Sequence, residues 1–368
     1  MIRVLHVIGK MDIGGAETML MNIYRNIDRN KIQFDFMVHT AKECFYDKEI
    51  RKMGGKIYRT SRFNIFNLRT YRKFWDNFFS EHPEYRIVHG HINSSAAVYL
   101  SLAKKYHRIA VVHSHATKST EKNLRTLAFR LCSYPIRYIA DYYFGCSVQA
   151  GIDRFGMKVV DSRYFCVLKN GIESRKYSYD VSKRLMVRGE LGISENQIVV
   201  GHVGRFTAAK NHKFLIDLFS VFNRKYPNSV LCLIGQGELE DTLSNQVQTL
   251  KIGDKVLFLG TTDRVNDYLQ AMDVFVFPSL FEGLGIALIE AQAAGLHCVV
   301  SQNIQEEADI KAGLITKLNL SDSWEKWADQ IYLAACDDRF DTQRHIEQTG
   351  FDISSSVRQL TEFYMSVL

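Results

Sequence analysis

The chain has 368 residues, of which 46% are hydrophobic and 24% are charged. This length and balance exclude a disordered or fibrous chain and indicate a globular protein of two domains. The seven cysteines are scattered and have no metal-site spacing, which excludes a disulfide framework and predicts reduced thiols.

The net charge of +7 is unevenly spread along the chain. Up to Lys176 there are 30 Lys and Arg against 15 Asp and Glu, whereas the remainder has 17 against 25. A basic first half suits an anionic membrane surface, an anionic substrate or nucleic acid, so we expect the two halves to face different partners.

The N-terminal stretch MIRVLHVIGKMDIGG lacks the long apolar region of a signal peptide. No stretch of the sequence reaches the roughly 18 uninterrupted apolar residues that a membrane span needs. We therefore expect a cytoplasmic protein, peripheral at most to the inner face of the plasma membrane.

Short apolar runs alternate with amphipathic helical patterns along the whole chain. In the first half, strands are predicted at residues 4–8, 34–38, 57–58, 87–89, 110–113, 143–146 and 165–168, and helices at 18–25 and 96–106. In the second half, strands are predicted at 198–203, 229–234, 256–259, 274–277 and 298–300, and helices at 213–226, 238–250 and 265–271. Continuous apolar strands separated by helices predict the α/β class, here as two doubly wound, Rossmann-like domains.

The domain boundary is expected in the polar segment between Ile172 and Glu195, which lacks strand alternation and precedes a fresh strand. We predict a first domain over residues 1–175 and a second over 176–350. Residues 351–368 read as a final helix.

Ligands of open α/β sheets bind outside the carboxyl ends of the strands, so the loop after each strand is of interest. The first such loop carries Gly14 and Gly15 before a helix, where backbone N–H groups can approach an anion, although a plain turn is the simpler explanation. The GxGxxG spacing is absent and the second strand ends in Val38-His39-Thr40 instead of an acid. A dinucleotide-dependent dehydrogenase is therefore disfavoured.

Histidines follow two further strands. His89, His91 and Asn93 come after one strand, and His113 and His115 come after the next. We expect at least one of these side chains to touch substrate, although a single histidine is more often structural. No nearby Cys, Asp or Glu completes a convincing zinc ligand set, so no metal site is predicted.

The second half opens with a strand-to-helix loop that carries two cations, Arg205 and Lys210. The guanidinium fork and the ammonium point charge suit phosphate oxygens, and two solvated surface cations are the alternative. The next strand runs into Gly235, which begins another turn with exposed backbone.

The stretch FPSLFEGLGIALIEAQAAG, residues 277–295, combines a glycine-containing loop with a helix that is apolar all round. Such a helix is normally buried, yet it carries Glu290, about two turns after Glu282 of the loop. Carboxylates accept sugar hydroxyls and a helix N-terminus favours phosphate, so the arrangement fits a nucleotide sugar with its diphosphate in the middle. Alternatively, Glu290 pairs with a neighbouring cation.

Six motifs follow one another along nearly the whole chain: GGAE at 14–17, HSH at 113–115, NG at 170–171, GRF…K at 204–210, GQGELE at 235–240 and E-x7-E from Glu282 to Glu290. In this order they resemble the family 4 glycosyltransferases, which are retaining enzymes of the GT-B fold, and especially those of bacterial exopolysaccharide and capsule synthesis. The resemblance implies two domains facing a central cleft, with the acceptor bound by the first domain and the donor by the second. It also implies that the final helix, residues 351–368, crosses back and packs on the first domain.

The resemblance also implies roles for individual residues. Donor binding is expected at Gly15, Arg205, Lys210, Gly235, Val265, Glu282, Gly283, Leu284, Gly285 and Glu290. Arg205 and Lys210 would hold the diphosphate, Glu290 the ribose and Glu282 the donor sugar, with the backbone near Val265 at the base. His115, with His113 as its competitor, and Glu282 would serve the reaction centre, and His91 and Asn93 would bind the acceptor.

By the same resemblance, the activity is hexosyl transfer from a UDP-sugar to a lipid-linked or glycan acceptor in exopolysaccharide, capsule or O-antigen synthesis. No metal or other cofactor is expected, and the leaving phosphate takes the acceptor's proton while domain closure excludes water. The cationic and apolar segment 118–143 would lie in a membrane interface, or else is an ordinary solvated helix.

Three other functions remain open from the sequence. A sugar-nucleotide epimerase or hydrolase would use the same fold without an acceptor, and a non-catalytic partner would support another transferase. Nucleic-acid binding would explain the basic half, but no recognition-helix or aromatic RNA-binding signature supports it.

Overall fold

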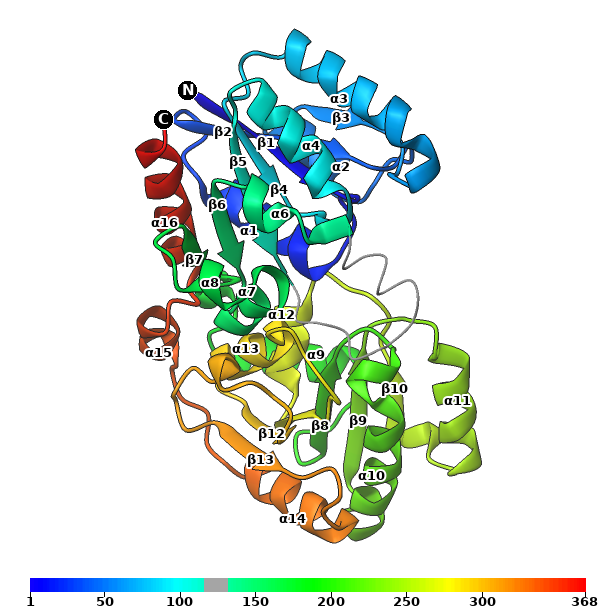
Figure 1. Cartoon of the computed structure of the whole chain (residues 1–368). Helices are drawn as coiled ribbons and strands as arrows, with labels where there is room; N and C mark the ends of the chain where they lie inside the picture. Colours follow the sequence, from blue (N-terminus) through cyan, green and yellow to red (C-terminus); the bar gives the residue numbers. More distant parts are fainter. Residues whose placement is uncertain (116–131) are drawn as a thin grey trace. The chain divides into compact units, whose positions relative to one another are not determined.

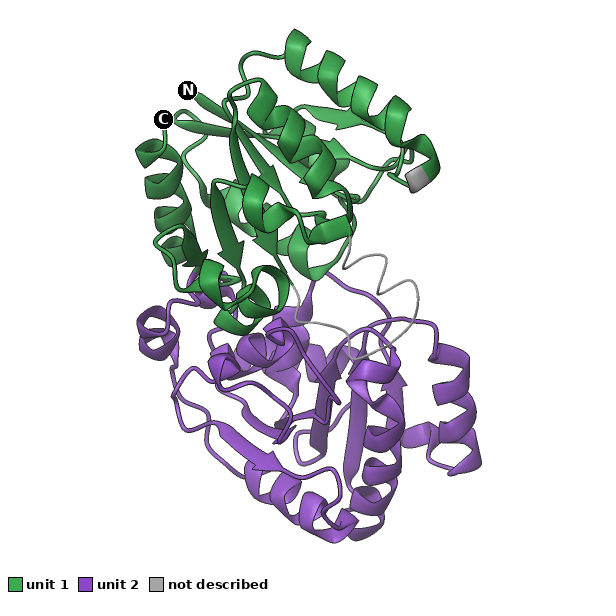
Figure 2. Ribbon diagram, in the orientation of Figure 1, with its two compact units in different colours: residues 1–172, 353–368 green, residues 173–352 purple. Residues whose placement is uncertain are grey.

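The computed structural model describes residues 1–115 and 132–368. These residues form two parallel β-sheets, each covered by helices on both faces (Figure 1). The chain divides into unit 1, residues 1–172 and 353–368, and unit 2, residues 173–352 (Figure 2). The predicted boundaries fall after residues 175 and 350, and the observed ones after 172 and 352.

Unit 1 is built on a seven-stranded parallel sheet in the order β3-β2-β1-β4-β5-β6-β7. Its strands are β1 (Ile2–Ile8), β2 (Ile32–Val38), β3 (Ile57–Arg59), β4 (Ile87–Gly90), β5 (Ile109–Ser114), β6 (Tyr142–Gly145) and β7 (Phe165–Val167). Neighbouring β1 and β4 are followed by helices on opposite faces, which makes the gap beyond their carboxyl ends the switch point where such sheets bind ligands.

Two apolar clusters cover the two faces of this sheet. One face packs against α1 (Gly15–Asn26), α2 (Asp47–Lys52) and α16 (Ile353–Ser366). The other packs against α3 (Leu68–Glu81), α4 (Asn93–Lys105), α6 (Ile136–Ile139) and α7 (Val148–Phe155). The alternation of β1, with Val4 on the first face and Leu5 on the second, follows from the period of two of a strand.

The C-terminal helix α16 belongs to unit 1, although 180 residues of unit 2 precede it in the chain. Leu360 and Tyr364 are fully buried in the same cluster as α1. The helix is also fastened by side chains, since Ser356 Oγ donates to the Lys169 carbonyl at 2.8 Å. Unit 1 is therefore completed by the last residues of the chain.

Unit 2 carries a six-stranded parallel sheet in the order β10-β9-β8-β11-β12-β13. Its strands are β8 (Ile198–Val203), β9 (Ser229–Ile234), β10 (Val256–Phe258), β11 (Val274–Phe277), β12 (His297–Ser301) and β13 (Ile315–Leu318). Helices α10 (His212–Lys225), α11 (Glu240–Thr249) and α14 (Trp324–Ala335) pack on one face, and α12 (Val265–Ala271) and α13 (Ile286–Ala293) on the other. The switch point lies between β8 and β11.

The expected polar linker after Ile172 is in part a helix, α9 (Val181–Glu190), which packs on α12 inside unit 2. Strand β13 also lies where no element is predicted, because Thr316 and Lys317 interrupt the apolar run of this edge strand. Helix α9 reads as a polar linker because its arginines look like surface residues, whereas Arg184 and Arg188 form ion pairs with Asp273.

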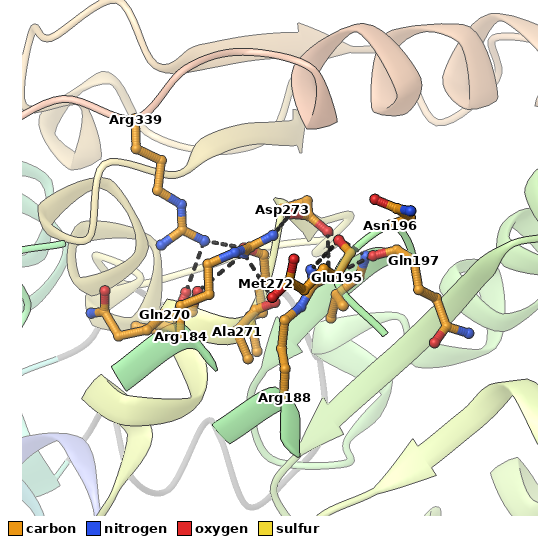
Figure 3. A network of polar contacts seen from close by, with 12 residues as sticks. Arg184, Arg188, Glu195, Asn196, Gln197, Gln270, Ala271, Met272, Asp273 and Arg339 are labelled. Carbon is orange, nitrogen blue, oxygen red and sulfur yellow. Dashed lines mark hydrogen bonds and ion pairs between the residues drawn. The ribbon is translucent and has the colours of Figure 1, made fainter. Parts of the chain in front are cut away.

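Figure 3 shows the polar network that anchors α9. The Asp273 carboxylate pairs with Arg184 at 2.5 Å and with Arg188 at 3.0 Å. It also accepts a hydrogen bond from the Val199 backbone N–H at 2.7 Å. Arg339 donates to the backbone carbonyls of Leu269 and Met272 near the end of α12. These contacts lie at the amino ends of β8 and β11, so the network fixes the end of the sheet opposite to the switch point.

Candidate active site

The loop after β11 and the loop after β8 meet at the switch point of unit 2. Leu280 N donates to the Ala209 carbonyl at 2.8 Å, and Asn211 Nδ2 donates to the Pro278 carbonyl at 3.1 Å. Asn211 adopts a left-handed conformation with φ 58°, which asparagine tolerates better than most residues. The two predicted donor loops are therefore held as one surface by backbone contacts.

Lys210 and Glu282 form an ion pair across these loops. Lys210 Nζ lies 2.7 Å from Glu282 Oε1, and the Glu282 side chain is only 10% exposed. The ammonium also lies 4.8 Å from the centre of the Phe277 ring. Gln305 Nε2 donates to the Glu282 carbonyl at 3.2 Å and so fixes the backbone of the loop. The structure brings together two of the predicted site residues and holds a cation where an anion can reach it.

Arg205 differs from Lys210 in its surroundings. It is exposed, and its side chain makes no hydrogen bond or ion pair with the residues that the structure describes, although its backbone carbonyl accepts from Thr207 N at 2.7 Å. Its guanidinium has therefore not been committed to a protein partner within that part of the chain. In the loop after β8, the charge of Lys210 is therefore neutralised by Glu282, whereas the charge of Arg205 is not neutralised by any described residue.

The glycines of this region allow close backbone packing. Gly235 has φ +138°, and a Cβ there would lie 2.2 Å from the Gly204 carbonyl oxygen. A Cβ on Gly237 would lie 2.4 Å from the Phe206 carbonyl oxygen. The turn after β9 thus packs directly on the loop after β8, which positions Arg205 and gives Gly235 a structural reason for being glycine.

Helix α13 begins with its N-terminus beside the Glu282 loop. Gly285 is the N-cap, with φ +74°, and its conformation turns the chain from the loop into the helix. Gly283 is partly exposed, whereas Leu284 is buried at 6% exposure. The unpaired N–H groups of the first turn and the helix dipole make this end suited to phosphate.

Glu290 has a polar partner that the sequence does not reveal. Tyr177 Oη donates to Glu290 Oε1 at 2.7 Å, so within residues 1–115 and 132–368 the partner of this carboxylate is a tyrosine and not the cation considered as the alternative. Burial raises the pKa of Glu290 to about 7, and the Tyr177 hydrogen bond offsets part of that rise. Tyr177 lies 113 residues earlier in the polar segment, and no local pattern marks it as a partner.

Val265, the residue expected near the base, is the first residue of α12. The preceding turn is shaped by Gly260, with φ +65°, and by the Arg264 backbone N–H, which donates to Thr262 Oγ1 at 3.0 Å. Arg264 itself pairs with Asp267 and Glu190. The turn thus presents backbone groups at the carboxyl end of β10, with its nearby arginine already engaged.

In unit 1, Gly14 and Gly15 lie at the switch point, where α1 begins with Gly15. A Cβ on Gly15 would meet no atom within 4 Å, so this backbone is open. Beside it lies a cavity of about 840 Å³ at the ends of β1, β2 and β4. Its lining includes Lys10, Glu17, Arg62, Phe63, Phe66 and Ser94.

The histidines predicted at two strand ends form a single stack with a fifth histidine from β1. His6 faces His89 in the β1–β4 register, and the rings of His6, His89, His91, His113 and His115 follow one another at centroid distances of 4.1 to 5.6 Å. His6 Nδ1 lies 3.0 Å from His91 Nε2, and His91 Nδ1 lies 2.7 Å from His115 Nε2. Burial lowers the pKa of each of these imidazoles, to about 3 for His6 and about 4 for His115, so all five are neutral at pH 7.

Burial distinguishes the two candidates for the reaction centre. His113 is fully buried, whereas His115 is partly exposed, so of the two only His115 has side-chain surface open to solvent. The expected acceptor residues are also covered, because His91 and Asn93 are each 9% exposed. Asn93 Nδ2 donates to the His113 carbonyl at 3.4 Å, which gives Asn93 a role in holding the strand end.

The segment 118–143 that is expected at a membrane interface falls largely outside the described residues, as positions 118–131 belong to the undescribed stretch. Among the helices that the structure does describe, none is long and apolar enough to cross a membrane.

Comparison with known proteins gives this geometry a family. Residues 13–147 match the model of "Glycosyltransferase Family 4", and residues 184–350 match "Glycosyl transferases group 1". The Bacillus subtilis protein EpsF, named as a glycosyltransferase, is 33% identical over 372 residues, with 98% of this chain and 96% of EpsF covered. The chain belongs to the family 4 glycosyltransferases. It is therefore a transferase enzyme, and the resemblance drawn from the six ordered motifs is confirmed.

Two further similarities concern this family 4 enzyme. An Escherichia coli UDP-Gal:α-D-GlcNAc-diphosphoundecaprenol α-1,3-galactosyltransferase is 33% identical over 171 residues, which cover 45% of this chain and 44% of the relative. The crystal structure of Anabaena Alr3699/HepE in complex with UDP-glucose matches all of both chains with a TM-score of 0.79 at 20% identity. This structural likeness confirms the GT-B fold of two Rossmann-like domains.

Proposed function

We propose that this family 4 enzyme transfers a hexose from a UDP-sugar, with retention at the anomeric carbon, to a lipid-diphosphate-linked or glycan acceptor in exopolysaccharide, capsule or O-antigen synthesis. The observation that carries the proposal is the convergence of Arg205, Lys210, Glu282 and the α13 N-terminus at the switch point of unit 2. The relative named as a UDP-galactose transferase and the UDP-glucose bound to a protein of the same fold support this donor.

The donor's diphosphate meets a site that is already charged and ordered. Lys210 approaches the phosphates while still within reach of Glu282, so its charge is oriented before the donor arrives. Arg205 adds a second cation, and the first turn of α13 adds backbone donors. Such pre-positioned charges stabilise the leaving diphosphate without a metal, because they act where negative charge develops.

The two carboxylates hold opposite ends of the donor. Glu282, freed from part of its contact with Lys210, accepts hydroxyls of the sugar. Glu290 accepts the ribose hydroxyls, with Tyr177 as the group that keeps an oxygen of the carboxylate in position. The base lies against the backbone of the turn before Val265.

In the transfer step, the bond between the anomeric carbon and the β-phosphate oxygen breaks, and the acceptor oxygen bonds to the same face of that carbon. The acceptor's proton passes to the leaving phosphate oxygen, so no carboxylate nucleophile is required. His115, partly exposed at the end of β5, contacts the reacting sugar or acceptor with the exposed part of its ring, while its Nε2 lies 2.7 Å from His91 Nδ1.

The acceptor enters the cavity of about 840 Å³ in unit 1. Lys10 and Arg62 suit the diphosphate of a lipid-linked acceptor, and Phe63 and Phe66 suit its first isoprenoid units. Phe66 is fully exposed and Phe45 is 59% exposed, so the rim of this end of unit 1 also suits contact with the cytoplasmic face of a membrane.

Direct assays test the proposal. UDP-hexoses are screened by thermal shift, and the best ligand is then incubated with a sugar-diphospho-polyprenol acceptor while product anomer and free UDP are followed. We expect an α-linked product from an α-linked donor, with activity unchanged by EDTA. Release of UDP at the same rate without acceptor indicates a hydrolase, and an inverted linkage overturns the retaining mechanism.

A further inference from the structure

Unit 1 has a second cavity, with a volume of about 740 Å³, at the amino ends of β5, β6 and β7. Ile109 and Tyr142, which begin β5 and β6, line it together with Tyr164, which precedes β7. The cavity proposed for the acceptor and His115 lie at the opposite, carboxyl edge of the same sheet. An extended chain rises about 3.3 Å per residue, so Ile109 and His115 are about 20 Å apart. This amino-edge cavity is therefore separate from the transfer step.

The amino-edge cavity is rich in tyrosine. Four tyrosines line it: Tyr138, Tyr142, Tyr143 and Tyr164. The Tyr142 ring is fixed between Tyr164 and Phe363 of α16, with ring centroids 5.9 and 5.1 Å away. Tyr138 is 75% exposed and Tyr164 is 43% exposed. Aromatic rings that remain exposed around one cavity present ready apolar faces, each with a polar hydroxyl at its tip.

Hydrogen-bonding groups of both kinds stand beside these rings. Asp141 Oδ2 accepts from the Ala110 backbone N–H at 2.9 Å, and the other oxygen of Asp141 pairs with Lys104. Arg108 donates to the Phe79 carbonyl at 3.3 Å through one terminal nitrogen, while its Nε is buried without a hydrogen-bond partner among the described residues. Because Lys104 and Asp141 neutralise each other, the cavity offers donors and acceptors with little net charge.

We propose that the amino-edge cavity is an accessory binding site for an oligosaccharide. A sugar ring carries C–H groups on its faces, which pack on tyrosine rings, and hydroxyls around its rim, which need both donors and acceptors. A free phosphate fits less well, because the ammonium of Lys104 already has a carboxylate partner and the aromatic faces would gain no contact. A purely apolar ligand would cover the charged groups without pairing them, which is costly.

This site goes beyond the proposed function, because it lies at the edge of the sheet opposite to the reacting groups. A glycan chain held there stays on the enzyme between encounters of its other parts with unit 1. Such a second attachment raises the effective concentration of the chain without any new contact at the reaction centre. That consequence for transfer rests on the proposed function, whereas binding of the sugar does not.

Saturation-transfer difference NMR on the full-length protein tests the proposal, with chitotetraose, cellotetraose and a hyaluronan tetrasaccharide as probes. We expect at least one probe to bind with a Kd of about 1 mM or below. Tyr138→Ala and Tyr164→Ala should each weaken that binding about tenfold, because each removes an aromatic face. Tyr138→Phe keeps the ring and should bind nearly as wild type.

Two aromatic variants serve as controls. Tyr332→Ala removes a tyrosine of unit 2 that is 36% exposed and should leave binding unchanged. Phe66→Ala removes an exposed ring from the cavity proposed for the acceptor and should also leave it unchanged. Circular dichroism verifies the fold of each variant.

The proposal is overturned if no probe binds at about 10 mM, if both Tyr138→Ala and Tyr164→Ala bind as wild type, or if Phe66→Ala abolishes binding. AMP and inorganic phosphate are titrated in parallel, and binding of AMP through the same tyrosines without binding of any sugar would replace the glycan by a nucleotide. Failure of wild-type protein to bind any UDP-hexose would count against the proposed function and leave the oligosaccharide result unaffected.

Discussion

Lys210 and Glu282 form an ion pair at the proposed donor site. An ion pair of two largely covered side chains keeps each charge oriented, and a diphosphate offers the ammonium a stronger partner when it arrives. Because both side chains are largely covered, the attraction between the two charges is offset by the cost of removing them from water, so the pair adds little net stability. Its geometry therefore matters more for the donor than for stability.

Removing the ammonium should impair transfer while the protein stays folded. We predict that Lys210→Ala lowers kcat/KM about 10²–10³-fold, the usual cost of losing one group that stabilises developing charge, and lowers the free energy of unfolding by about 1–3 kcal/mol, because Glu282 is left without its cation. Steady-state kinetics and urea unfolding measure the two effects. Lys213→Ala, an exposed lysine of α10, is the matched control and should behave as wild type. Near wild-type turnover of Lys210→Ala would place the diphosphate elsewhere.

Glu290 gives donor binding a pH dependence. Its pKa lies at about 7, against 4.5 for an ordinary glutamate, so the folded protein holds this proton over that interval while the unfolded chain has released it. The group therefore favours the folded state most at low pH, and this contribution falls as pH rises from 4.5 through 7. Ribose hydroxyls need the ionised carboxylate, so donor binding follows the opposite trend.

We predict that the Kd for a UDP-hexose increases about tenfold from pH 8 to pH 6, because one proton must leave Glu290 on binding below its pKa. A UDP-hexose is used because its diphosphate, unlike that of UDP, does not titrate in this range. In Glu290→Gln the affinity should be lower and flat with pH, as calorimetric titration can measure. An unchanged pH slope in that variant would exclude Glu290 from the ribose contact.

At the scale of elements, helix α9 shows why the polar segment after Ile172 misleads. Arg188 is only 2% exposed, yet its side chain is polar enough to read as a surface residue in the sequence. The helix uses Arg184 and Arg188 to reach Asp273 at the start of β11. A polar sequence can therefore be either a solvated linker or a helix whose charged side chains are buried in ion pairs, and the sequence alone does not distinguish the two.

The same network makes Asp273 a test of unit 2's stability. We predict that Asp273→Ala lowers the free energy of unfolding by about 3–5 kcal/mol, because two arginines lose the anion that compensates their burial. Asp329→Ala removes an exposed partner of Lys225 and should cost about 1 kcal/mol or less. Urea unfolding followed by intrinsic fluorescence compares them. Equal effects of the two changes would contradict the anchoring role of α9.

Helix α16 shows a similar limit of the helical pattern of apolar residues, which marks a buried face without naming the surface that covers it. The tail reads as amphipathic, and its buried face consists of residues such as Leu360 and Tyr364. What the pattern cannot state is which surface receives that face. In the structure this face packs on the sheet of unit 1 beside α1, and Tyr364 Oη lies 2.6 Å from His89 Nδ1.

At the scale of the whole molecule, the charge division follows the two units. The basic first half forms most of unit 1, where Lys10 and Arg62 line the cavity that also contains Phe66. Cations beside exposed aromatic side chains favour an anionic membrane surface, and about 1 kcal/mol is expected for each lysine or arginine near such a surface.

We predict that the full chain co-sediments with vesicles containing phosphatidylglycerol, and that binding falls as salt is raised from 50 to 500 mM. The change Phe66→Asp together with Arg62→Glu should weaken binding about tenfold or more, because each replacement adds a negative charge at the rim. The exposed Tyr332→Asp in unit 2 is the control. A protein that stays in the supernatant at low salt would remove the membrane from the proposed function.

The sequence by itself determined the α/β class, the two doubly wound domains and the family, because each depends on local signals: apolar runs, glycine spacing and an ordered set of motifs. It also singled out the loops that we propose as the donor site, since the carboxyl ends of parallel strands are where ligands bind. Lys210 and Glu282 were proposed this way, each from its own loop, and the fold brings them into contact.

Tertiary structure alone decided the contacts between distant residues. Tyr177 on Glu290, Asp273 under two arginines, the burial that separates His115 from His113 and the joining of five histidines into one stack all depend on which strands are neighbours. Register and layer are collective properties of a folded sheet, so no local window contains them. The family could therefore be identified from the chain, whereas the partners of its charged groups required the fold.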